Sequence, residues 1–272
     1  MALTDKLSAI ADAIREKTGK TATMTLDQMP TEIASIESGG GTTTSGDIDA
    51  FITGTISEIS SNVTTVHEYA FYGFGNLKTA NLPLATSIGD RAFYESYLQT
   101  INAPLVTEIG DYSFGYCRFS TVNFPNVTSI GTGAFMNGSL TTADFPLVTT
   151  INSATFNGCT NLTTINFPKA TTIGGTAFNA CKYLVTADFP LVTSIGSSAF
   201  GTCSRLTALI LRNSSVCTLS NTSALSNTPI KSGTGYIYVP STLVDSYKAA
   251  TNWSTYAAQI RAIEDYPDIT GG

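Results

Sequence analysis

The chemistry open to this chain depends first on its single histidine, His67. A serine or cysteine nucleophile that is activated by an imidazole would have to use this residue. His67 nevertheless occupies a position of an internal repeat at which the other units carry Gly or Asn. Because the repeat is not built around an imidazole, we expect no catalysis there, and the chain is predicted not to be an enzyme.

The cysteines are the next candidates, for a metal site or for disulfides, and their spacing argues against both. Four of them recur at one position of the repeat: Cys117, Cys159, Cys181 and Cys203. Thiols in a line at about 5 Å cannot surround a zinc ion tetrahedrally, and parallel Cβ vectors disfavour a disulfide. We expect buried, small apolar side chains there, whereas Cys217 lies outside the series and has no evident partner. Asp144 and Asp188, two turns apart at about 10 Å, cannot share a cation, so no metal or cofactor is predicted.

The elements that position these residues follow from three repeat series with one register. The steps within each series are 21 or 22 residues, and the unit reads roughly I-G-x-x-A-F-x-x-C-x-x-L-T-T-I-x-F-P-x-V-T-S. The first series is Phe71, Phe93, Phe114, Phe135, Phe156, Phe178 and Phe200. The second is Val66, Ile88, Ile109, Ile130, Ile151, Ile173 and Ile195, and the third is Pro83, Pro104, Pro125, Pro146, Pro168 and Pro190.

Each unit is too short to bury its own apolar side chains, but stacked neighbours bury them together. The segment L-T-T-I-N-F alternates apolar and polar residues before the proline, which predicts a short strand. Seven such strands, stacked at about 4.8 Å, predict a parallel sheet about 30 Å long. We expect Ile165, Phe167 and their equivalents to point into the core, together with the Phe that follows a small residue at a tight bend.

The repeats over about residues 50 to 211 resemble the BspA-type leucine-rich repeat family. Units of that family carry L-x-x-I-x-L-P followed by I-G-x-x-A-F-x-x-C. Here Phe often replaces the last Leu, and three units lack the cysteine, at Phe74, Ser96 and Gly138. The resemblance implies a curved, β-rich solenoid of seven units that recognises other molecules and usually has no enzymatic activity.

Four regions are predicted along the chain. Residues 1–38 form a helical module for attachment or oligomerisation, residues 39–46 a flexible linker, residues 47–211 the solenoid with its N-terminal cap, and residues 212–272 a C-terminal cap. In that cap Ser241 is expected to cap a helix. The attachment module is predicted from one apolar helical stripe: Leu3, Leu7, Ile10 and Ile14.

Outward polar columns form the first candidate binding surface. Successive strands carry Thr at one position and Asn or Asp two residues later, and the candidates for ligand binding are Thr121, Asn123, Thr142, Asp144, Thr164 and Asn166. Such groups can hydrogen-bond a glycan or a peptide backbone. A structural role accounts for the pattern more readily than a binding site does, because Thr is a common exposed strand residue and ladders of amides satisfy one another.

Tyrosines in the first three units form the second candidate surface: Tyr72, Tyr94, Tyr97, Tyr112 and Tyr116. Later units place Asn157, Asn179 and Gly201 where Tyr72 and Tyr94 stand. Core packing does not require this difference between the units. Exposed tyrosine is typical of recognition surfaces, and flat rings also suit the faces of sugars, but packing between neighbouring units is an alternative explanation.

Charge and hydropathy exclude several classes of partner. The chain has 14 basic and 20 acidic residues and no basic cluster, so neither nucleic acid nor an anionic membrane is expected as the main partner. No apolar run of about 18 residues is present, which excludes a membrane-spanning helix on sequence grounds. Acidic residues in the opening segment MALTDKLSAIADAIREK do not fit a signal peptide.

The two terminal segments carry a further resemblance. The segment that begins LTDKLSAIADAIREK is similar to the N-terminus of many bacteriophage and prophage tail proteins, and the segment that begins IYVPSTLVDSYKAATNW is similar to the C-terminus of phage-borne BspA-type proteins. This resemblance implies a virion tail protein, assembled in the bacterial cytoplasm. Residues 1–38 would join other tail proteins, and the solenoid would bind a host-surface glycan. We also expect a homo-oligomer, because an array of weak sites gains avidity. The alternative is a bacterial BspA-like surface adhesion protein that binds a host protein.

Overall fold

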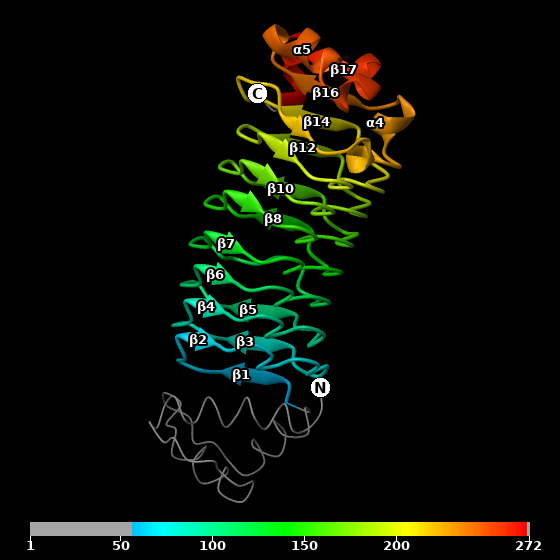
Figure 1. Ribbon diagram of the computed structural model, residues 1–272. Coiled ribbons are helices and arrows are strands. Elements are labelled where there is room, and N and C mark those ends of the chain that lie inside the picture. Colours follow the sequence, from blue (N-terminus) through cyan, green and yellow to red (C-terminus); the bar gives the residue numbers. More distant parts are fainter. Residues whose placement is uncertain (1–55, 271–272) are drawn as a thin grey trace, which may run out of the picture.

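The computed structural model describes residues 56–270, which form one elongated stack of repeated turns (Figure 1). Most turns contribute two short parallel strands. The first series is β1 (Glu58–Ser60), β3 (Thr79–Asn81), β5 (Thr100–Asn102), β8 (Thr142–Asp144), β10 (Thr164–Asn166), β12 (Thr186–Phe189), β14 (Ala208–Leu211) and β16 (Tyr236–Val239). The second series is β2 (Thr65–Val66), β4 (Ser87–Ile88), β6 (Glu108–Ile109), β7 (Ser129–Ile130), β9 (Thr150–Ile151), β11 (Thr172–Ile173), β13 (Ser194–Ile195) and β15 (Thr218–Leu219).

The predicted β-rich stack of parallel strands is confirmed, in the register of the repeat. Thr79 lies opposite Thr100, and Ile88 lies opposite Ile109. The second strand of each turn, within V-T-S-I, was not predicted, although the alternation of polar Ser or Thr with buried Ile is its signal.

The predicted continuous sheet is wrong in one respect, because the first series forms three separate sheets: β1-β3-β5, β8-β10, and β12-β14-β16 with β17 (Ile260–Ala262). Residues 121–123 form no strand. In this unit Phe119 takes the position at which the neighbouring units carry Leu98 and Leu140, and its ring packs edge-on against Phe114 at 5.6 Å. The bulkier ring coincides with the break in strand pairing.

A ladder of phenylalanine rings runs along the core. Successive rings from Phe71 to Phe200 stack nearly parallel, with ring centroids 5.1 to 5.5 Å apart. Phe167 is buried as predicted, whereas Ile165 is half-buried and packs against the edge of the core. The small residue before the Phe is buried in six of the seven units, as at Ala92 and Ala134, and allows the bend to close, whereas Ala70 in the first unit is half-buried.

The bends hold many residues other than glycine in the left-handed region of φ. Tyr69, Tyr112 and Tyr116 have φ values of 57°, 54° and 63°. Bulky residues adopt this conformation at a cost, so the surrounding structure must impose it. Here the backbone amide of each ladder phenylalanine donates to a carbonyl of the next unit, as from Phe93 to Ser113 at 2.8 Å.

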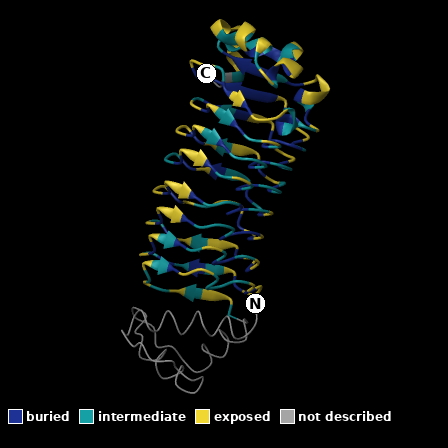
Figure 2. Cartoon of the chain, in the orientation of Figure 1, coloured by how far each residue is buried: buried dark blue, intermediate teal, exposed yellow. Residues whose placement is uncertain are grey.

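The C-terminal region extends the stack and then covers its end. It contains η1 (Thr222–Leu225), α4 (Pro229–Ser232), η2 (Ser241–Leu243), α5 (Val244–Ala249), η3 (Trp253–Gln259), η4 (Ile263–Asp265) and η5 (Pro267–Thr270). Figure 2 shows buried residues over β14 and β16, where earlier strands expose polar side chains. None of the described helices is long and apolar enough to cross a bilayer.

The C-terminal cap is held to the stack at Cys217, whose N–H donates to the Tyr247 hydroxyl at 2.9 Å and whose carbonyl accepts from the Trp253 indole at 2.6 Å. One expectation for this region needs correction. Ser241 does not cap a helix. It is the first residue of η2, and its side chain makes no capping hydrogen bond. Its backbone N–H donates instead to the Glu264 carboxylate at 2.9 Å, and this contact ties η2 to η4.

At the other end, Ile56 and Ile59 pack against the core and begin the stack. The predicted helical module at 1–38, with Leu3, Leu7, Ile10 and Ile14, lies outside the described residues, and so does the predicted linker at 39–46.

Candidate binding surfaces

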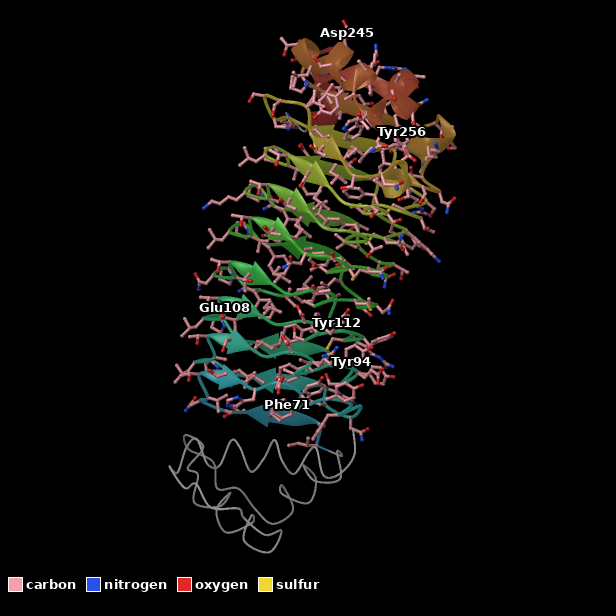
Figure 3. All side chains as sticks on the ribbon, in the orientation of Figure 1. Phe71, Tyr94, Glu108, Tyr112, Asp245 and Tyr256 are labelled. Carbon is pink, nitrogen blue, oxygen red and sulfur yellow. The ribbon has the colours of Figure 1, made fainter. Side chains whose placement is uncertain are left out.

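The structure brings most of the predicted tyrosines together along one edge of the first units. We call this surface the tyrosine face; it comprises Tyr69, Tyr72, Tyr94, Tyr97, Tyr112 and Tyr116. The rings of Tyr72 and Tyr94 stack with centroids 5.3 Å apart, and Tyr94 meets Tyr116 edge-on at 5.4 Å. Figure 3 shows Tyr94 and Tyr112 on the same edge of the stack. Three predicted residues therefore form one continuous row.

Two arginines complete this surface, and the sequence analysis missed both. The Arg91 guanidinium lies 5.6 Å from the Tyr69 ring centroid and 5.0 Å from that of Tyr112, and it donates to the Tyr69 hydroxyl at 3.0 Å. The Arg118 guanidinium lies 4.2 Å from the Tyr97 ring centroid. Aligning the units could have predicted both contacts. Arg91 occupies the repeat position of Tyr69 and Tyr112, and Arg118 occupies that of Tyr97 in the next unit.

Glycines make room for these rings. A Cβ atom at Gly115 would lie 2.7 Å from the Tyr94 ring, and one at Gly133 would collide with the Tyr112 ring. Each tyrosine therefore packs over the backbone of the next unit. This arrangement fixes the rings before any partner arrives, which lowers the entropy cost of binding.

The tyrosines of this surface differ in exposure and in the pKa of their hydroxyls. Tyr97 and Tyr116 are 39% and 36% exposed. Burial raises the pKa of the Tyr94 hydroxyl to about 12, with further contributions from Tyr116 and Glu95. This hydroxyl therefore stays protonated and can donate a hydrogen bond.

The polar columns are divided into two runs. The Asn102 amide donates to Asn81 at 2.7 Å, and that of Asn166 donates to Asp144 at 2.8 Å. Thr142 and Thr164 lie opposite each other on β8 and β10. Thr121 and Asn123 lie between the two runs, in the segment that forms no strand. The paired amides have part of their hydrogen-bonding capacity occupied by one another, and the Thr164 hydroxyl lies 3.5 Å from that of Thr163.

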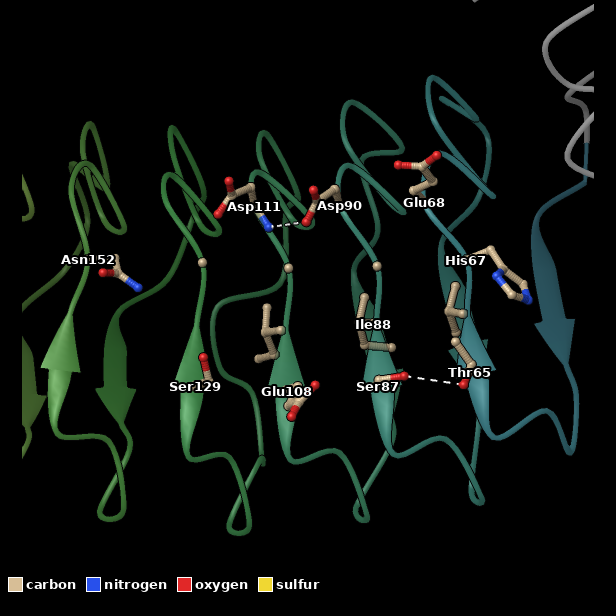
Figure 4. A pocket seen from close by; sticks show the side chains of 15 residues that line it. Thr65, His67, Glu68, Ser87, Ile88, Asp90, Glu108, Asp111, Ser129 and Asn152 are labelled. Atoms are coloured by element: carbon tan, nitrogen blue, oxygen red, sulfur yellow. Dashed lines mark hydrogen bonds between the residues drawn. The ribbon is translucent and has the colours of Figure 1, made fainter.

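The cysteines and the histidine lie in different environments. Each in-line thiol donates to a phenylalanine carbonyl one unit back, as from Cys159 to Phe135 at 3.0 Å, and burial raises the pKa of the Cys159 thiol to about 12. His67 is exposed and lines an open groove of about 550 Å³ (Figure 4). Within residues 56–270, no three His, Cys, Asp or Glu side chains converge as metal ligands.

Comparison with known families gives the repeat its identity. The sequence model of the family described as BspA type leucine rich repeat region matches three overlapping stretches of the chain, residues 52–148, 86–207 and 128–244. The chain belongs to the BspA-type leucine-rich repeat family. The leucine-rich repeat fold is typically a non-enzymatic interaction scaffold.

Solved structures with the same repeat are similar only in part. A leucine-rich repeat protein from Bacteroides ovatus is 21% identical, with a TM-score of 0.47, and the match covers 67% of this chain and 54% of that one. The chain thus spans about half the length of that relative. The T. pallidum leucine-rich repeat protein is 26% identical over 45% of this chain and 72% of its own, with a TM-score of 0.36. A leucine rich cell surface protein from Faecalibacterium prausnitzii is 17% identical over 75% and 86%, with a TM-score of 0.31. No curated protein matches the chain.

Proposed function

We propose that this BspA-type protein is a non-enzymatic interaction protein whose tyrosine face binds a partner protein at a cell surface. The observation that carries the proposal is the pre-arranged row of Tyr72, Tyr94 and Tyr116 beside the two tyrosine–arginine clusters. Tyrosine and arginine are the residues most enriched where protein interfaces concentrate their binding energy. Core packing does not need them, because the later units stack equally well without them.

The geometry favours a protein over a glycan as the partner. Stacking against a sugar requires an open ring face, and neighbours already cover one face of three rings: Tyr72 and Tyr94 stack on each other, and Arg118 lies over Tyr97. The surface also carries phenol hydroxyls and guanidinium N–H groups. Protein partners offer the carbonyls, carboxylates and apolar side chains that such groups contact.

The test is a binding comparison between two sets of variants. The triple variant Tyr94→Ala, Tyr97→Ala and Tyr116→Ala is measured against a panel of purified host extracellular proteins and against a glycan array. The matched control is Tyr183→Ala, since Tyr183 is 45% exposed and pairs with Arg205 at 4.4 Å in a later unit. We expect at least one protein to bind the wild type and the control, and to bind the triple variant about 30-fold more weakly, which corresponds to about 2 kcal/mol.

Two results would contradict the proposal. One is binding to glycans alone, which would indicate that the ligand is recognised by exposed ring faces or by the polar columns. The other is protein binding that the triple variant retains in full. Circular dichroism and thermal melting of each variant separate loss of binding from loss of the fold.

A role in a phage tail is the less supported function. It rests on the resemblance of the two terminal segments, and attachment through residues 1–38, a homo-oligomeric state and a virion location all depend on it. The family match favours the alternative of a bacterial surface-type repeat protein. Tail genes beside the coding sequence, together with loss of particle incorporation when residues 1–38 are deleted, would favour the phage function instead.

A further inference from the structure

The open groove beside β2, β4, β6 and β7 is a second surface with its own composition. We call it the carboxylate groove, after the side chains that line it: Glu68, Asp90, Glu108 and Asp111. His67 lies at one end and Asn152 at the other, and between them Gly89, Gly110 and Gly131 leave the floor without side chains (Figure 4). The groove spans the turns from Val66 to Ile151, a length of about 19 Å at 4.8 Å a turn.

Close packing of the turns dictates the glycine floor. A Cβ atom at Gly89 would lie 2.6 Å from the Glu68 backbone nitrogen, and one at Gly131 would lie 2.5 Å from that of Asp111. Any other residue at these positions would have to push the turns apart. The groove is therefore a consequence of the stacking and keeps its form without a ligand.

The backbone holds two of the four carboxylates in place. Asp90 Oδ1 accepts the N–H of Asp111 at 2.7 Å, and Asp111 Oδ1 accepts the N–H of Thr132 at 2.6 Å. Each aspartate uses one oxygen in this way, which leaves the other available to a ligand. The side chains of Glu68 and Glu108 are exposed. Within residues 56–270 none of the four forms an ion pair, and no Lys or Arg lines the groove.

This concentration of negative charge is specific to the first units. The position of Glu68, Asp90 and Asp111 is taken further along the stack by Thr132, Ser153, Gly175 and Ser197. Since every unit stacks in the same way, the carboxylates are not required for the fold. A concave surface that bears one sign of charge concentrates the field and attracts ligands of the opposite sign.

We propose that the carboxylate groove binds an extended segment of a partner protein that is rich in lysine or arginine. Six residues of extended chain span about 20 Å, which matches the groove. Flexible lysine and arginine stems can adjust to the spacing of the turns. A metal ion is not the expected ligand, because the carboxylates follow one another along the stack and no three ligands converge within the described part of the chain. The groove contains no residue of the tyrosine face, so this inference does not depend on the proposed function.

The test uses fluorescence polarisation of a labelled peptide of about six lysines. The groove variant is Glu68→Gln with Glu108→Gln. It removes two charges and keeps the aspartate–backbone hydrogen bonds of Asp90 and Asp111. The matched control is Asp245→Asn with Asp265→Asn, which removes the same charge from exposed positions at the C-terminal end of the chain, where Figure 3 labels Asp245. We expect the groove variant to bind about 3- to 10-fold more weakly than the wild type, the range for the loss of two exposed ion pairs, and the control to bind as the wild type does.

A second variant and a second probe make the result unambiguous. Ser129→Lys places an ammonium group in the groove and should also weaken binding of the lysine peptide, whereas the tyrosine triple variant should bind it normally. A peptide of glutamates should not bind. Failure of the wild type to bind the lysine peptide at low salt would overturn the proposal. Equal weakening in the groove variant and its charge-matched control would also overturn it, because binding would then reflect only the net charge of −6.

Discussion

Replacing Ser113 with alanine should stabilise the protein. Ser113 occupies the small-residue position before the ladder phenylalanine, where five of the seven units carry alanine. Its side chain is fully buried, and its hydroxyl has no hydrogen-bond partner among the described residues. Thr155 stands at the equivalent position two units later, but its hydroxyl donates to the Asn152 carbonyl at 2.8 Å. The two positions therefore differ in whether a buried hydroxyl is satisfied.

The magnitude follows from that difference. An unsatisfied buried hydroxyl costs about 1–3 kcal/mol, whereas the lost contacts of one oxygen atom are worth a few tenths of a kcal/mol, at about 0.1–0.2 kcal/mol each. We expect Ser113→Ala to raise the free energy of unfolding by about 1 kcal/mol and the Tm by about 2–4 °C. Thr155→Ala removes a made hydrogen bond and a methyl group, and it should lower the free energy of unfolding by about 1–2 kcal/mol.

Thermal and urea unfolding measure the two variants, and amide hydrogen exchange locates the effect. In a stack each unit contacts only its neighbours, so Ser113→Ala should slow exchange most at nearby amides, such as that of Phe93, which donates to the Ser113 carbonyl. If Ser113→Ala proved neutral or destabilising while Thr155→Ala behaved as expected, the hydroxyl would have to be satisfied in solution, and the reasoning would fail.

Two further predictions concern the core. Phe156→Ala should cost about 3–5 kcal/mol, the usual range for a buried aromatic ring, because this ring is fully buried between two ladder neighbours; Phe71→Ala should cost clearly less because Phe71 is half-buried, and urea titration of both variants would test the difference. Burial raises the pKa of the Cys117 and Cys159 thiols to about 12, so they stay protonated in the folded chain while unfolded thiols ionise above about pH 8.5. Stability should therefore fall as the pH rises from about 8.5 towards 12, by about 1.4 kcal/mol per pH unit for each thiol, and Cys159→Ala should make the pH dependence correspondingly shallower.

The stack could be predicted because its signals repeat in every unit. The Phe, Ile and Pro series share one register, and only stacked turns bury such residues together. The second strand was missed because it is only two residues long, as in Ser87–Ile88, too short for alternation to stand out. The gap at residues 121–123 was missed because this segment follows the repeat pattern like its neighbours, and the adjacent Phe119 stands in a position that any apolar residue satisfies.

The binding surfaces were predictable only where one residue type recurred. Tyr72, Tyr94 and Tyr116 stood out as a composition difference between units, and the structure places their rings in one row. Arg91 and Arg118 did not stand out, because a single arginine in a unit has no periodicity. The carboxylate groove was missed for a related reason: its acids come from two repeat positions, and the glycine that forms its floor recurs in five of the seven units, including later units without the acids.

Both surfaces lie in the first units, and the stack tolerates them there because packing constrains the inward side chains more than the outward ones. Inward positions are constrained in every unit, since each ring or aliphatic side chain packs on the equivalent one in the next unit. Outward positions are constrained only by the adjacent turns, so a change such as Thr132 for Asp111 alters the surface without altering the core. Because the turns stack in register, equivalent outward side chains form columns in which neighbours lie about 4.8 Å apart. A few substitutions in neighbouring units thus produce an extended surface. The tyrosine face and the carboxylate groove are two surfaces of this kind on the same turns, and they are adjacent in the chain where Asp111 precedes Tyr112.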